Sequence, residues 1–120
     1  MSPRTGIGPE GFAFISADGN FTGGNAPSAS DLDFNSRHGF YITSSAYILR
    51  PEVLESNFYG WRITGDVKYL ERAARAIESF NRVLAINGAF SGITNVNSAT
   101  GGARFDDMES FFFAEVMKYL

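Results

Sequence analysis

The chain of 120 residues contains no cysteine and a single histidine, His38. Without cysteine, the segment forms no disulfide bond and performs no thiolate chemistry. With one histidine it lacks the His/Cys spacing of zinc sites, and it also lacks the nucleophile-elbow and phosphate-loop motifs. Any metal bound here is therefore expected to have oxygen ligands, which points to calcium or magnesium.

Basic residues and long apolar runs are also scarce. The chain has 10 Lys and Arg against 13 Asp and Glu, for a net charge of −3. We expect no nucleic-acid partner, because such proteins carry a basic surface. No apolar run is long enough to span a bilayer, and the first residues do not resemble a signal peptide. With 44% hydrophobic and 19% charged residues, the composition is that of an ordinary globular domain.

The sequence at both ends of the chain predicts that it is a piece of a larger domain. It stops at Lys118-Tyr119-Leu120, inside an apolar helical pattern without a capping signal. It begins with no predicted helix or strand ahead of Gly6. We therefore expect residues 1–120 to be part of a single domain that is incomplete at both ends. Aromatic residues, at 15%, are abundant enough to supply both a core and a site that stacks on flat ligand faces.

Residues 1–46 are rich in Gly, Ser, Asn and Asp, and we expect short strands or irregular structure there. Asp18-Gly19-Asn20 predicts a turn, and residues 23–31 predict an exposed loop. Asn20-Phe21-Thr22 fits the N-glycosylation sequence, which matters only if the chain enters the secretory pathway.

The rest of the chain predicts helices. A helix over residues 51–63 should end at Thr64-Gly65, and Asp66 should cap a second helix that runs to about Ile86. Residues 89–104 predict a short hairpin, and Asp106 or Asp107 should cap a third helix that reaches Leu120. Helices that alternate with short β loops favour an all-α fold, a barrel of helix pairs whose loops build one end of a pocket.

Arg50-Pro51-Glu52 and Glu55 form the strongest candidate site. Pro51 suits the first turn of a helix, on which Glu52 and Glu55 would share nearly one face. Two carboxylates on one face repel each other, and a metal, a sugar or a proton-transfer task is a frequent reason for keeping them. The alternative is a solvated helix N-terminus, where acids interact favourably with the helix dipole.

A second candidate cluster lies near the C-terminus, and a third acid lies near the N-terminus. Phe111 and Glu115 are four residues apart, so a ring and a carboxylate share a helix face, an arrangement that suits a sugar. The alternative is a core phenylalanine beside a surface glutamate. Glu10 lies in the rigid turn Gly8-Pro9-Glu10-Gly11, and without further support it is simply a loop acid.

These stretches together resemble glycoside hydrolase family 47, the class I α-1,2-mannosidases. The amino-acid sequence of the central stretch most resembles that of fungal members. The resemblance runs along most of the chain. The matching stretches are Thr5-Gly6-Ile7-Gly8-Pro9-Glu10, Leu49-Arg50-Pro51-Glu52-Val53-Leu54-Glu55-Ser56, Trp61 to Tyr69, Phe90-Ser91-Gly92-Ile93, and Met108 to Leu120 with Glu109, Phe111 and Glu115.

The resemblance implies an (αα)7 barrel that removes terminal α-1,2-linked mannose from high-mannose N-glycans, with inversion and with calcium as cofactor. It implies that Glu52 is the general base, that Arg50 and Glu55 line the sugar subsite, and that Phe111 lies beneath the bound mannose. It also implies that Glu115, Glu109 and Glu10 are acidic pocket residues. Glu10, Glu52 and Glu115 would contact calcium only through water, and the direct ligand would lie downstream of Leu120.

The family's general acid would lie upstream of this segment, so the isolated chain is expected to be inactive. The resemblance further implies a monomer in the ER or Golgi or secreted, with a membrane link only through a missing N-terminal segment. Two alternatives remain open. One is a lectin-like relative that binds mannose glycans in glycoprotein quality control, and the other is a helical-hairpin interaction domain with incidental acids.

Overall fold

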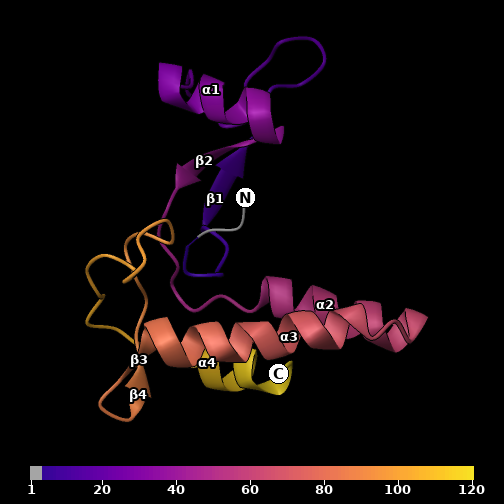
Figure 1. Ribbon diagram of the computed structural model, residues 1–120, viewed down its shortest axis with the longest axis vertical. Coiled ribbons are helices and arrows are strands. Elements are labelled where there is room, and N and C mark those ends of the chain that lie inside the picture. The colour runs from indigo at the N-terminus through magenta and orange to yellow at the C-terminus, as the bar shows by residue number, and fades with distance from the viewer. Residues whose placement is uncertain (1–3) are drawn as a thin grey trace.

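The computed structural model describes residues 4–120, which form a helical base and a smaller lobe that stands away from it (Figure 1). In chain order the elements are β1 (Gly11–Ala13), α1 (Ala29–His38), β2 (Tyr41–Ser44), α2 (Glu52–Thr64), α3 (Lys68–Ser79), the π-helical turn η1 (Phe80–Leu84), β3 (Ala85–Ile86), β4 (Ala89–Phe90), α4 (Ser110–Ala114) and the 3₁₀ turn η2 (Val116–Lys118).

The helices α2 and α3 pack side by side as the predicted hairpin (Figure 1). Gly65 ends α2 in the left-handed conformation, with φ of 68°, and its N–H donates to the Trp61 carbonyl at 2.7 Å. The Asp66 carboxylate then accepts the N–H of Lys68, the first residue of α3, at 3.0 Å. The prediction of two helices around a Gly65-Asp66 connection is confirmed.

The end of the second helix differs from the prediction. The Ala85 N–H donates to the Phe80 carbonyl, five residues back, so the helix widens into η1 and stops at Leu84. Ala85–Ile86 then pairs with Ala89–Phe90 as an antiparallel hairpin. Asn87 and Gly88 have φ of 48° and 82°, as a tight hairpin turn requires. Asn87-Gly88 therefore connects two strands, and the helix does not extend to Ile86.

The helix α1 lies where the sequence predicted a loop or irregular structure, and that prediction was wrong. Ser28 forms a capping box: its hydroxyl accepts the Asp31 N–H, and the Asp31 carboxylate accepts the Ser28 N–H. Gly39 closes the other end with φ of 80°. The helix buries no residue, so the apolar periodicity that predicted the other helices was absent, and local capping defines this one.

Ser28→Ala is expected to lower the free energy of opening of α1 by about 1 kcal/mol, because the first-turn N–H loses its acceptor. Hydrogen exchange of the α1 amides in the full-length protein measures this quantity. Ser36→Ala makes the same chemical change on the exposed face of α1, and it should change the free energy by no more than about 0.5 kcal/mol. Equal effects of the two substitutions would contradict the capping role.

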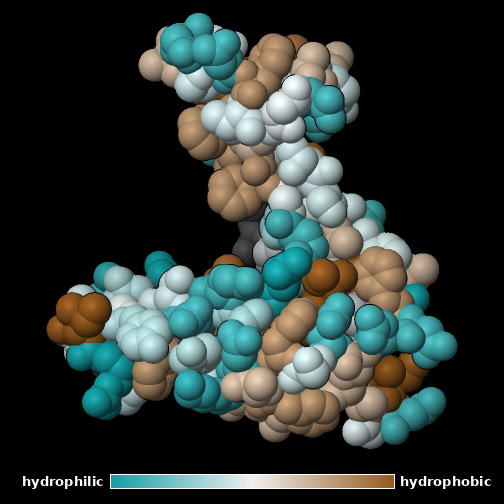
Figure 2. Space-filling view, turned by 180° about the vertical axis from the view of Figure 1, so that it is seen from behind, coloured by the Kyte–Doolittle hydropathy of each residue, from teal (hydrophilic) through white to brown (hydrophobic). Residues whose placement is uncertain are grey.

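The lobe is built on β1 and β2, which pair antiparallel with Phe12 opposite Ile42 and Ala13 opposite Tyr41. The turn predicted at Asp18-Gly19-Asn20 is present, since the Ser16 N–H donates to the Asn20 carbonyl at 3.0 Å. The strands β1 and β2 are separated by α1, so the hairpin of the base is β3–β4. The hairpin predicted over residues 89–104 differs in the structure: Ala89–Phe90 pairs with the preceding Ala85–Ile86, and Ile93 and Arg104 form an isolated bridge. The lobe and the base enclose a hollow in the surface (Figure 2).

The third predicted helix starts later than expected and is interrupted. It begins at Ser110 after Glu109, so neither Asp106 nor Asp107 caps it. Glu115, with φ of −131° and ψ of −55°, separates α4 from η2. Among residues 4–120, none of the helices combines the length and the apolar character that a bilayer crossing needs.

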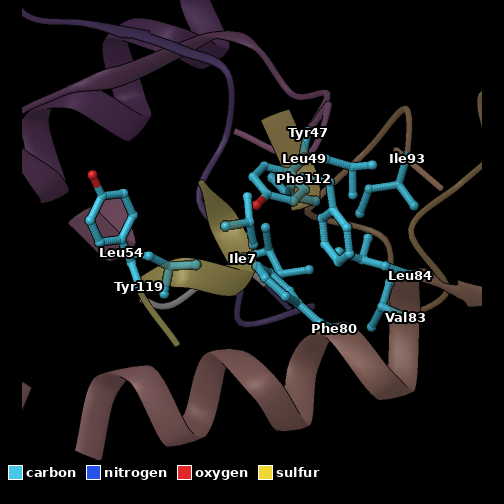
Figure 3. Packing of buried hydrophobic residues seen from close by; sticks show 12 residues of the cluster. Ile7, Tyr47, Leu49, Leu54, Phe80, Val83, Leu84, Ile93, Phe112 and Tyr119 are labelled. Atoms are coloured by element: carbon cyan, nitrogen blue, oxygen red, sulfur yellow. The ribbon is translucent and has the colours of Figure 1, made fainter. Parts of the chain in front are cut away.

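The hydrophobic core lies in the base, where α2, α3, η1 and the C-terminal turns meet the Tyr47–Leu49 segment (Figure 3). Leu84, Ile93, Val96 and Val116 are fully buried. Tyr47 and Leu49 belong to this cluster and are 8% and 1% exposed. The segment that carries Arg50 and Glu52 is therefore anchored in the core just before it reaches the surface.

Candidate functional site

Glu10 and Arg50, which lie 40 residues apart in the sequence, form a direct ion pair in the structure. The Arg50 Nε donates to Glu10 Oε2 at 2.6 Å, and the Ile48 N–H donates to Glu10 Oε1 at 2.8 Å. The Glu10 side chain is 14% exposed, and that of Arg50 is 50% exposed. Both oxygens of a largely buried carboxylate are thus satisfied by the segment that precedes α2.

Glu52 completes the cluster as an exposed acid beside the same cation. Its Oε1 lies 3.7 Å from the Arg50 Nη1, and its side chain is 62% exposed. Glu10 first, by hydrogen bond and charge, and then Glu52 and Glu109 by charge, raise the pKa of Arg50 above its ordinary value. The guanidinium is therefore permanently charged, and it lies between a largely buried acid, Glu10, and an exposed acid, Glu52.

The backbone just before Arg50 has an unusual conformation. Leu49 has φ of 67°, a left-handed conformation that is unfavourable for a residue other than glycine. The Tyr47 hydroxyl donates to the Arg50 carbonyl at 3.0 Å, and Tyr47 exchanges two backbone hydrogen bonds with Ile93, each of 2.9 Å. Pro51 then takes the N-cap position of α2, so Glu52 is the first residue of that helix. This strained turn directs Arg50 and Glu52 to the surface.

Burial raises the pKa of the Tyr47 hydroxyl far above its usual value, and the charges of Glu10 and Glu52 add to the effect. The hydroxyl therefore keeps its proton and remains a donor to the Arg50 carbonyl at any physiological pH. No helical or strand periodicity marked Tyr47 as part of the site. Only its place three residues before Arg50 could have suggested it.

Tyr47→Phe is expected to lower the free energy of unfolding by about 1–2 kcal/mol, because the Arg50 carbonyl loses its buried donor. Thermal unfolding measures this effect.

Tyr41→Phe is the matched control. The Tyr41 hydroxyl is buried and has no hydrogen-bond partner among residues 4–120. Its removal should leave stability unchanged or raise it, because an unsatisfied polar atom is lost. If Tyr47→Phe were as mild as Tyr41→Phe, the hydrogen bond to Arg50 would not support the turn.

The cluster opens onto a cavity of about 530 Å³ at the junction of lobe and base. Glu10, Arg50 and Glu52 supply its charged groups. The other lining residues, mostly apolar, are Gly6, Ile7, Gly8, Pro9, Phe12, Tyr47, Val53, Leu54, Ala76 and Phe80. An apolar cavity with a few convergent polar groups is the usual form of a small-molecule site.

The other predicted site residues lie outside this cavity in the part of the chain that the structure describes. Glu55 accepts a hydrogen bond of 3.2 Å from the Tyr119 hydroxyl. Exclusion of water and then the charge of Glu55 raise the pKa of Tyr119 to about 12. Glu52 and Glu55, which were predicted to share nearly one face of the helix, therefore contact different partners.

The predicted site residues near the C-terminus also lie outside the cavity that Glu10, Arg50 and Glu52 line. Glu109 precedes α4 and lines a smaller cavity of about 150 Å³ beside Ile48 and Leu49. Phe111 is half-buried and packs against the core. Glu115 is exposed at the junction of α4 and η2. The structure thus brings Glu10, Arg50 and Glu52 together, with Glu109 close enough to influence Arg50.

Direct binding of a cation needs several oxygen or nitrogen ligands close together. Within residues 4–120, no three His, Asp or Glu side chains gather closely enough to hold an ion directly. The acids near the cavity do offer oxygen atoms, the donors that calcium prefers. Glu52 is exposed, and the two Glu10 oxygens each retain a lone pair beyond the hydrogen bond they accept. These acids fit a water-mediated contact with a hard cation.

Comparison with known proteins identifies the family. The profile of Glycosyl hydrolase family 47 matches residues 1–120. Mannosyl-oligosaccharide alpha-1,2-mannosidase 1B of Aspergillus phoenicis is 48% identical over 98% of this chain, and a probable enzyme of the same name from Aspergillus niger is 49% identical. The chain spans 21% of the length of each of these relatives.

A solved structure gives the same result. The alpha-1,2-mannosidase from Trichoderma reesei superposes with a TM-score of 0.86 at 44% identity, over 98% of this chain and 24% of that one. The predicted fold, a piece of an (αα)7 barrel with short β-hairpin loops, is confirmed by this match. The resemblance predicted from the Gly-Pro-Glu and Arg-Pro-Glu motifs is confirmed as well. The chain therefore belongs to glycosyl hydrolase family 47.

Proposed function

We propose that the chain is part of the catalytic domain of an inverting, calcium-dependent α-1,2-mannosidase that trims terminal mannose from N-glycans. One observation carries the proposal: an exposed carboxylate, Glu52, lies 3.7 Å from a permanently charged guanidinium at the edge of an apolar cavity. Family membership and the names of the relatives support the choice of mannose as the sugar.

In this proposal Glu52 acts as the general base. An inverting glycosidase needs a carboxylate that takes a proton from water while the water attacks the anomeric carbon. A carboxylic acid about 6.5–9.5 Å away protonates the leaving oxygen from the other side. Glu52 has the exposure that contact with water requires, and Arg50 holds its position from one side. The acid partner is expected outside residues 1–120.

The other residues bind and orient. Arg50, fixed by Glu10, presents donors that suit sugar hydroxyl groups, and the apolar wall of the cavity excludes water from the reacting bond. Glu55, Phe111, Glu115 and Glu109 remain proposed substrate-binding residues that would act in the complete barrel. Glu10, Glu52 and Glu115 would contact calcium through water, and the ion, when bound, would hold hydroxyl groups of the sugar.

The anomer of the released sugar tests this proposal. The full-length protein is incubated with an α-1,2-linked mannobiose, and proton NMR follows the first product. β-Mannose is expected to form first and then to mutarotate. Initial release of α-mannose would contradict inversion, and no release of mannose would contradict the hydrolase itself. Activity that survives chelation of divalent ions would contradict the role of calcium.

A further inference from the structure

The turn that follows β1 carries a motif that the proposed reaction does not use. Asn20-Phe21-Thr22 is an Asn-X-Thr triplet, and no other asparagine in the chain is followed two residues later by Ser or Thr. All three residues are exposed, and they lie in the loop between β1 and α1 that extends from the lobe (Figure 1). We propose that Asn20 carries an N-linked glycan.

The local geometry keeps the Asn20 amide and the Thr22 hydroxyl at the surface. The Thr22 Oγ1 donates to the Phe14 carbonyl at 3.0 Å and accepts the Phe14 N–H at 2.9 Å, which fixes Thr22 across the hairpin. Ile15 and Phe21 form the bridge between the two arms. The exposed Asn20 is therefore presented at the end of an ordered hairpin, and its environment is set by Asp18.

The folded turn accepts the modification without losing its contacts. The Asn20 Nδ2 donates to Asp18 Oδ2 at 2.6 Å, and hydrogen bonds from Ser16 and Asn20 lower the pKa of Asp18. Nδ2 carries two hydrogens, and attachment of a sugar replaces only one of them. The remaining N–H can still donate to the ionised Asp18.

An exposed ring lies on the same face. Alternate residues of paired strands point to the same side, so Asn20, Thr22 and the opposing Phe14 share one face of the hairpin. Phe14 is 47% exposed. The first sugar on Asn20 can cover this ring with its apolar C–H face, so the glycan would shield apolar surface without displacing any contact of the turn.

The covalent step transfers an oligosaccharide from a lipid-linked donor to the Asn20 side chain. A bond forms between Asn20 Nδ2 and C1 of an oligosaccharide carried on a lipid pyrophosphate. The bond from C1 to the pyrophosphate oxygen breaks, the lipid pyrophosphate leaves with the electron pair, and one amide proton is released to solvent. A membrane-bound transferase of the secretory pathway catalyses this transfer from the lipid-linked donor. The inference therefore rests on the proposed function to the extent that it needs the chain to enter that pathway.

Peptide mapping of the full-length protein from its own cells tests the inference. Enzymatic removal of N-glycans in heavy-oxygen water should convert Asn20 into a labelled aspartate. Asn20→Gln and Thr22→Val should each remove one glycan's mass, whereas Thr22→Ser should retain glycosylation because it keeps the hydroxyl. Asn25→Gln, an exposed asparagine of the same loop without the triplet, should change nothing.

Two variants separate glycosylation from folding. Thr22→Val also removes the two hydroxyl hydrogen bonds to Phe14, but Asn20→Gln leaves them in place, so loss of the glycan in both cannot come from the hairpin alone. An unmodified Asn20 in protein that has passed through the secretory pathway overturns the inference, even if mannose release is normal. A protein found outside that pathway overturns the inference together with the location in the ER or Golgi, or outside the cell, that the family resemblance implies. A glycan on Asn20 in a protein that releases no mannose supports the inference and contradicts the proposed function.

Discussion

Glu52→Gln in the full-length protein is expected to lower kcat for mannose release by on the order of 10²–10⁴-fold, the usual contribution of a general base. Glutamine keeps the size and shape of the side chain but cannot take a proton from water. Glu52 is 62% exposed, so the substitution should not unfold α2. Calcium-dependent binding of a high-mannose glycan should therefore remain, and calorimetric titration can measure it beside the kinetics.

Glu78→Gln is the control for this experiment. Glu78 lies on the exposed surface of α3, and the same change there should leave kcat unaltered. Unchanged turnover in Glu52→Gln would remove Glu52 as the base. If the wild-type protein bound glycans but released no mannose, the lectin-like alternative would be preferred.

Glu10→Gln in the full-length protein is expected to cause the second-largest loss of kcat, although Glu10 is not proposed to touch the reacting bond. The amide oxygen can still accept the Ile48 N–H, but the amide NH₂ would then face the Arg50 Nε, and two donors would oppose each other. The loss of a charged hydrogen bond predicts a decrease of about 1.5 kcal/mol in the free energy of unfolding. Displacement of Arg50 predicts a loss of kcat on the order of 10²-fold.

A similar carboxylate-to-amide change elsewhere provides the comparison. Asp33 pairs with Arg37 within α1, with side chains 67% and 58% exposed. Asp33→Asn should cost less than about 0.5 kcal/mol, because exposed ion pairs contribute little to stability. If Glu10→Gln and Asp33→Asn had the same effect on unfolding and on kcat, then the Glu10–Arg50 pair would be an ordinary surface contact.

The helical hairpin was predictable because its signals are local. Gly65 must take a left-handed conformation to end α2, and Asp66 lies where it can accept the first N–H of α3. The boundary at Leu84 was not predictable, since the widening into η1 depends on packing in the core. Helix α1 was missed because it buries nothing, although Ser28 and Asp31 carried a capping signal.

The site was only partly predictable. Arg50 and Glu52 are neighbours in the sequence, so their proximity followed from the chain itself. The pairing of Glu10 with Arg50 spans 40 residues and depends on the antiparallel association of β1 with β2, which no spacing rule supplies. Resemblance to the family placed Glu10 near the pocket, and the structure added the ion pair. The part played by Tyr47 came from the structure alone.

The left-handed backbone conformation of Leu49 restricts which amino acids can occupy position 49. Glycine would relieve the backbone strain but would leave a void where a side chain is now 1% exposed, and valine or isoleucine would fill the space at a greater conformational cost. We expect inherited variation at residue 49 to be narrow. The constraint would then act through the backbone conformation of a residue that is almost completely buried.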